Sequence, residues 1–127
     1  MTATLPAFDE PDLARTVERI SAEDLDALPF GAVLLDGEGR VLRFSDAERR
    51  LSGFGDRDAL GKAFFSEIAP CMGNPFFQAR IARAAEAGTV DIEMSHIGDF
   101  DDRDREIHVR ILSATGGGLW LFLRRIE

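Results

Sequence analysis

The spacing of the strand-like runs constrains the fold of this chain most, because two runs precede residue 45 and three follow residue 89. Gly31–Leu35 and Arg40–Phe44 are rich in apolar residues and are joined by the turn residues Asp36–Gly39, which predicts a β-hairpin. The later runs, in which apolar residues recur at strand spacing, are 90–94, 107–111 and 119–126. The five runs together predict a five-stranded antiparallel sheet.

Helical signals precede the first strand. Leu13, Val17 and Ile20 recur at helical spacing. Ser21 followed by Asp24 has the pattern of a helix start. We therefore expect an N-terminal cap of two short helices that are separated near residues 20 and 21.

A second helical region lies between the two groups of strands. Residues 45–69 are polar and interrupted by glycines, which favours short helices. Asn74 and Pro75 form a typical start for a longer helix, and Gly88 ends it. The predicted fold is an α+β domain with helices packed on one face of the sheet. We expect an N-terminal helical cap over residues 1–28 and a core over residues 29–127.

Length and charge exclude several classes of protein. The chain has 127 residues, which suits one domain, and a formal net charge of −8, which disfavours binding to nucleic acid or anionic lipid. No apolar run approaches the roughly 20 residues that cross a bilayer, and the N-terminus lacks a secretory signal. A cytoplasmic location is therefore expected. The single cysteine cannot form an intramolecular disulfide or a cysteine-based metal cage.

Cys71 is the most specific chemical feature. It follows Pro70 and lies just before the helix predicted to start at Pro75. The positive end of that helix would favour a thiolate, which is the form that attacks an activated acyl group. A lone cysteine is more often a small buried apolar residue, so position alone favours the structural interpretation.

Glu48 is the second candidate, shortly after the hairpin. A buried carboxyl at this place would have a raised pKa, remain protonated at neutral pH and donate a hydrogen bond to an anion. The alternative is a solvated helix residue that pairs with Arg49 or Arg50. The residues around Glu48 favour this second interpretation when they are taken alone.

Several segments together resemble the photoactive yellow protein family over nearly the full length of the chain. The shared stretches include the run from Gly61 to Phe65 and the element Ala69-Pro70-Cys71. The cysteine of that element is absent from PAS domains in general, so the resemblance is specific. The other matching stretches are 25–32, 35–39 and 120–122.

The resemblance implies a PAS-like fold and a bacterial blue-light photoreceptor. It implies p-coumaric acid as a covalent chromophore, joined to Cys71 as a thioester. Glu48 would be the hydrogen-bond partner of the phenolate and would donate a proton after light-driven trans–cis isomerisation. The buried carboxylate left behind is costly and would loosen the cap. Ser52 takes the place of a threonine and keeps its hydroxyl.

Other pocket positions depart from the family. Phe44 replaces a tyrosine that binds the phenolate, and Phe54 replaces an arginine that covers the chromophore and brings a positive charge. Phe100 replaces a second tyrosine, and Asp102 stands where a methionine assists the return to the dark state. These changes predict altered absorbance and slow recovery. Ala69 and Pro70 complete the predicted pocket.

Two other functions remain open. The chain could be a PAS module that binds no pigment and serves for interaction or dimerisation, or a sensor that uses Cys71 as a redox-sensitive thiol. An enzyme is least expected, because the sequence has no Ser-His-Asp order, phosphate loop or Cys/His metal spacing. We expect a monomer or weak homodimer that signals through a separate downstream protein.

Overall fold

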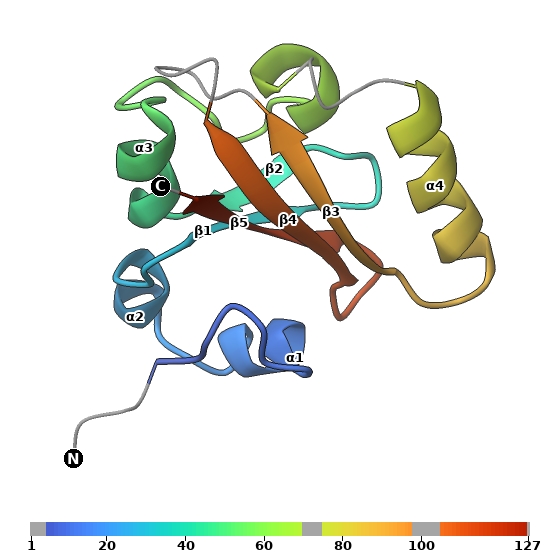
Figure 1. The fold of residues 1–127 in the computed structure, drawn as a ribbon, viewed down its shortest axis with the longest axis horizontal. Helices are drawn as coiled ribbons and strands as arrows, with labels where there is room; N and C mark the ends of the chain where they lie inside the picture. Colours follow the sequence, from blue (N-terminus) through green and yellow to red (C-terminus); the bar gives the residue numbers. More distant parts are fainter. Residues whose placement is uncertain (1–4, 70–74, 98–104, 127) are drawn as a thin grey trace.

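A computed structural model describes residues 5–69, 75–97 and 105–126. Its centre is an antiparallel sheet with strand order β2-β1-β5-β4-β3, which confirms the predicted five strands (Figure 1). Every neighbouring pair of strands is antiparallel, and β1 and β5 lie inside the sheet. The strands are β1 (Gly31–Leu35), β2 (Val41–Phe44), β3 (Asp91–Ile97), β4 (Glu106–Ser113) and β5 (Leu119–Ile126).

Helices begin and end close to the predicted places. The Ser21 side chain accepts a hydrogen bond from the Asp24 N–H at 3.0 Å, which caps the second helix of the N-terminal region. Gly53 has a φ of 83° and ends the third helix in the left-handed region, where glycine is favoured. The helical elements are α1 (Leu13–Val17), α2 (Ala22–Asp26), α3 (Asp46–Ser52), the π-helical turn η1 (Phe64–Ile68) and α4 (Pro75–Glu86).

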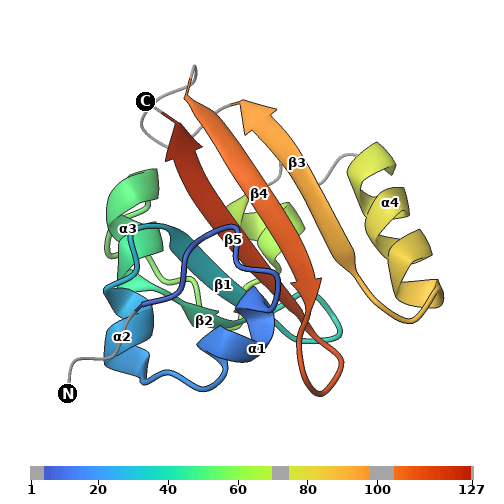
Figure 2. The ribbon, with the colours of Figure 1, turned by 60° about the horizontal axis from the view of Figure 1, so that its bottom comes forward.

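The two faces of the sheet carry separate apolar clusters, because successive side chains of a strand point in opposite directions. We call one the cap face, since α1 and α2 pack on it, and the other the helix face, since η1 and α4 pack on it (Figure 2). The strand residues of the cap face include Ala32, Leu112, Trp120 and Phe122. Those of the helix face include Val33, Val109, Ile111, Leu121 and Leu123.

Buried polar contacts fasten the N-terminal segment to the cap face. Arg110 of β4 is buried and donates hydrogen bonds to the backbone oxygens of Phe8 at 2.6 Å and Glu10 at 2.9 Å. The Trp120 indole N–H donates to a Glu18 carboxylate oxygen at 3.0 Å. The cap is therefore held by directional bonds as well as by apolar burial. Within the described ranges, no helix combines the length and apolar character needed to span a bilayer.

Candidate functional site

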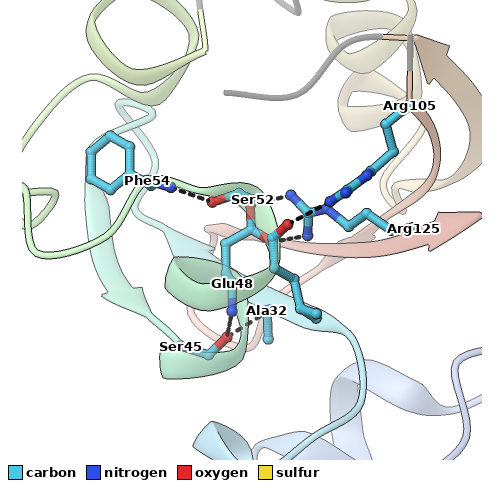
Figure 3. Close-up of polar contacts among 8 residues, drawn as sticks. Ala32, Ser45, Glu48, Ser52, Phe54, Arg105 and Arg125 are labelled. Carbon is cyan, nitrogen blue, oxygen red and sulfur yellow. Dashed lines mark hydrogen bonds and ion pairs between the residues drawn. The ribbon is translucent and has the colours of Figure 1, made fainter. Parts of the chain in front are cut away.

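Ser45 fixes the start of α3 against the sheet. Its hydroxyl oxygen accepts hydrogen bonds from the Glu48 N–H at 3.1 Å and from the Ala32 N–H of β1 at 3.0 Å (Figure 3). The Ser45 N–H in turn donates to the Ala32 backbone oxygen at 3.0 Å. One serine thus caps the helix and joins it to β1, so the side chain three residues later has a defined direction.

Glu48 lies inside the protein. Ser45 and Glu48 have the spacing of a capping box, in which the glutamate would reach back to the N–H of the serine. Here Ala32 already accepts from that N–H, and the Glu48 side chain is only 3% exposed. The interpretation of Glu48 as a solvated helix residue is therefore wrong for the side chain. Its role toward a chromophore stays a prediction.

Arg125 of β5 forms a two-pronged ion pair with Glu48. Its Nη1 donates to Oε1 at 2.5 Å and its Nη2 donates to Oε2 at 2.9 Å (Figure 3). The Arg125 side chain is 6% exposed. Two parallel N–H···O bonds match the planar fork of a guanidinium to a carboxylate, which is the strongest form of this contact. This geometry suits an ionised Glu48 in the protein without pigment.

Gly31 forms the floor beneath the Glu48 carboxyl. A methyl group at position 31 would lie 1.8 Å from Oε1 of Glu48, far inside contact distance. The carboxyl therefore occupies the space that any other residue at this place in β1 would fill. The missing side chain of Gly31 lets the acid lie directly on the sheet.

A second guanidinium lies at the other end of α3. Arg105, which precedes β4, donates to the backbone oxygen of Leu51 at 2.9 Å (Figure 3). This bond satisfies one of the carbonyl groups that the helix end leaves without an intrahelical partner. Arg105 and Arg125 thus place two positive charges beside the seven-residue helix α3.

Phe44 and Phe54 form an aromatic wall near α3. Their ring centroids are 5.2 Å apart with a tilt of 42°. The Arg49 guanidinium carbon lies 5.2 Å from the Phe44 centroid, and that of Arg57 lies 4.6 Å from the Phe54 centroid. The Ser52 hydroxyl oxygen accepts from the Phe54 N–H at 3.1 Å. Phe54 carries no charge itself, but Arg57 places a cation against its ring.

The structure brings four of the predicted site residues to one region. Phe44 ends β2, Glu48 and Ser52 lie on α3, and Phe54 follows the end of that helix. Ala69 is buried directly after η1, where its N–H donates to the Phe64 backbone oxygen at 2.7 Å. Four further predicted positions lie outside the described residues, namely Pro70, Cys71, Phe100 and Asp102.

Arg125 is the residue that the motif-based reasoning missed. Leu121, Leu123 and Arg125 follow one another at every second position of β5, so all three lie on the helix face. Strand alternation alone therefore places a charged side chain at the end of a buried apolar row. A charge in that position needs a buried partner of opposite charge. The sequence therefore indicated that Arg125 is paired, but it did not indicate with which residue.

The donor set suits an aromatic ligand with an ionisable oxygen. A buried carboxylate and guanidinium form a polar group, and the paired phenylalanine rings come from the residues that precede and follow α3. A flat ring can pack against such a wall, and its oxygen can share a proton with the carboxyl. Within residues 5–69, 75–97 and 105–126, no cluster of three or more His, Cys, Asp or Glu could hold a metal ion.

Comparisons with known proteins identify the family of this chain. Residues 25–124 match the PAS fold family. The photoactive yellow protein of Cereibacter sphaeroides is 31% identical over 120 residues, which are 94% of this chain and 96% of that protein. The chain belongs to the photoactive yellow protein family.

Other members and structures support this assignment. The photoactive yellow protein of Halochromatium salexigens is 28% identical over 94% of this chain and 96% of that protein. The crystal structure of the photoactive yellow protein domain from the sensor histidine kinase Ppr of Rhodospirillum centenum gives a TM-score of 0.71 at 31% identity. It covers 86% of this chain and 96% of that domain. The predicted PAS-like fold is thereby confirmed.

Proposed function

We propose that this protein is a blue-light photoreceptor that carries p-coumaric acid as a thioester on Cys71. The observation that supports this most directly is the burial of Glu48, on a helix that Phe44 precedes and Phe54 follows, in a chain of this family. Four of the residues that the resemblance assigns to the pocket lie around α3, although they come from a strand, a helix and a loop.

The residues present fit such a pigment. When bound, it would supply visible absorption, a bond that isomerises in light and a phenolic oxygen that exchanges a proton. Glu48 would be the hydrogen-bond partner of that oxygen and its proton donor. Phe44 and Phe54 would pack against the ring and exclude water, and Ser52 would hold the loop that carries Phe54 through their 3.1 Å bond.

The signal would leave through a change of conformation. A proton lost from Glu48 creates a new charge in a site with little access to water, which alters the interactions of the buried groups around it. The cap, residues 1–28, is the element that would loosen in response. A separate downstream protein would bind the loosened form, and the receptor would act in the cytoplasm as a monomer or weak homodimer.

Reconstitution tests this function directly. The pigment-free protein is mixed with an activated ester of p-coumaric acid, and the absorption spectrum and intact mass are recorded. We expect a visible band and a mass gain of one p-coumaroyl group, both absent from Cys71→Ser. A mass gain on another residue, or no band with the wild type, would reject the proposal.

A PAS module without pigment is the second candidate. The contact between the Phe44 and Phe54 rings and the ion pair of Glu48 already satisfy these side chains without a ligand. If the protein takes up no pigment in the reconstitution, this candidate is favoured. Its dimerisation can then be measured by sedimentation at several protein concentrations.

A further inference from the structure

The Glu48–Arg125 pair connects two elements that are distant in the sequence. The residues are 77 positions apart, and the bond joins α3 to β5 across the helix face. Both side chains are almost completely buried. A pair with this geometry favours the charged form of both partners, because a protonated Glu48 could not accept from both guanidinium nitrogens with equal strength.

Arg105 and Gly31, two described residues near the pair, do not oppose this state. Arg105 lies at the far end of the same helix, bonded to the Leu51 oxygen, and adds positive charge. Gly31 of β1 contributes no charge beneath the carboxyl. On α3 itself, Arg49 turns toward the backbone oxygens of Gly55 and Arg57, at 3.0 and 2.7 Å.

The N-terminal turn of α3 carries the nearest acidic neighbour in the chain. Asp46 is exposed, and its N–H donates to an Asp26 carboxylate oxygen at 3.0 Å. An exposed carboxylate is screened by water and acts weakly on a buried group. Among the described residues, Arg125 bonds to both oxygens of the Glu48 carboxylate.

We propose that Arg125 is the counter-ion of the Glu48 carboxylate and shifts the shared proton from Glu48 to the phenolic oxygen of the pigment. This inference rests on the proposed function and deepens it. In the transfer, the O–H bond of Glu48 breaks and an O–H bond forms on the phenolate oxygen, so the total charge of the site is unchanged. Arg125 stabilises only the arrangement that follows the transfer.

Arg125 acts here as a positioning residue, through Glu48. A guanidinium binds a carboxylate through two parallel bonds, whereas a phenolate has a single oxygen to offer. The same cation therefore favours charge on Glu48 over charge on the ring. Two consequences are a larger protonated fraction of the pigment in the dark and a slower return after light, because the charge left on Glu48 is already paired.

The first test uses the protein without pigment. The side-chain carboxyl carbons of glutamate are labelled with ¹³C, and the Glu48 signal is assigned by its absence in Glu48→Gln. We expect carboxylate at pH 7 in the wild type, and a titration midpoint at least about 1 pH unit higher in Arg125→Gln. A wild-type Glu48 that is protonated at pH 7, or equal midpoints in the two proteins, would overturn the proposal.

Arg124→Gln is the matched control. It removes the same charge from the neighbouring position of β5, but Arg124 lies over the Phe8 ring, 4.6 Å from its centroid, on the cap face. The Glu48 midpoint should be unchanged in this variant. Arg125→Lys keeps the charge but offers no fork, so its midpoint should lie between those of the wild type and Arg125→Gln. Circular dichroism checks that each variant is folded. If Arg125→Gln does not fold, the titrations of the wild type and of Arg125→Lys test the proposal instead.

The second test uses the pigmented protein. Titration of the visible band gives the protonation midpoint of the phenol, and a flash experiment gives the rate of dark recovery. Arg125→Gln should lower that midpoint by about 1 pH unit and accelerate recovery roughly tenfold, and Arg124→Gln should do neither. A pigmented Arg125→Gln that matches the wild type would reject the role of Arg125 and leave the photoreceptor function intact. A failure to take up pigment would reject the function, while the carboxyl titration would still test the pair.

Discussion

Each face of the sheet contains a buried arginine, but the two arginines bind different kinds of acceptor. On the cap face, Arg110 donates to the backbone oxygens of Phe8 and Glu10, which do not titrate. On the helix face, Arg125 donates to the Glu48 carboxylate, whose charge depends on a proton. The first contact should therefore hold at any moderate pH, whereas the second should respond to every event that moves the proton of Glu48.

The cap face also has an acid-sensitive contact, at Glu18. Partial burial acts to raise the pKa of Glu18, but hydrogen bonds from the Thr115 N–H and the Trp120 indole, with further help from the Thr115 hydroxyl and Arg15, lower it below its usual value. Glu18 therefore stays ionised through the neutral range. The proposed response of the helix face is to proton transfer at Glu48, whereas the Glu18 contact on the cap face should respond to acid.

The largest effect should come from breaking the pair on the helix face. Arg125→Gln should lower the free energy of unfolding by about 3 kcal/mol at pH 7, because it leaves a buried carboxyl without its cation. The double variant Glu48→Gln with Arg125→Gln should recover most of that loss. Urea denaturation of the three proteins measures this. If the double variant were as unstable as the single one, the loss would come from packing and not from charge.

The cap-face arginine should come next. Arg110→Gln should cost about 2 kcal/mol, since bonds from a charged donor are worth about 1.5–3 kcal/mol each and the amide can replace one of them. Hydrogen exchange should show faster exchange in residues 5–28, with the protection of α3 unchanged. Equal acceleration in both regions would mean that the two faces are not independent.

A smaller, pH-dependent effect is expected at Glu18. Its pKa is lowered on folding, so its contribution to stability is full above the pKa of the unfolded chain and is lost as the pH falls through the lower folded value. Glu18→Gln should therefore cost about 1 kcal/mol at pH 7 and less near pH 3. Thermal unfolding followed by Trp120 fluorescence measures both. A cost that stays constant between these pH values would exclude an electrostatic contribution.

The smallest change in stability, under about 0.5 kcal/mol, is expected for Phe44→Tyr if its hydroxyl reaches a polar partner. In the pigmented protein this variant adds a donor to the phenolic oxygen. The band should move to the blue and the phenol should protonate at lower pH. Absorbance titration of the variant beside the wild type measures both, and equal spectra with equal midpoints would show that position 44 does not contact that oxygen.

Local patterns in the sequence predicted most of the fold. The Ser21–Asp24 cap and the Gly53 helix end depend on residues close in the chain, and the strand runs show their own periodicity. The order of the strands could not be obtained in this way. It depends on which runs pair, and β1 pairs with β5, almost 90 positions later.

The candidate site was predicted only in part for the same reason. The resemblance identified Glu48, and the burial of its side chain depends on Ser45 and Gly31, which lie nearby in space. Its partner Arg125 comes from the other end of the chain. Alternation along β5 places Arg125 on the buried side, but only the folded sheet shows which acid it meets.

The bare backbone of Gly31 has a consequence for how this acid can vary. One added carbon at position 31 would fill the place of the Glu48 carboxyl. The depth at which this carboxyl is buried therefore depends on the residue at position 31 of β1, and not only on the length of the Glu48 side chain. An alanine there would push the same functional group outward toward solvent, with its chemistry intact and its surroundings changed. The size of one side chain on β1 thus governs how strongly the protein interior acts on a proton held by α3.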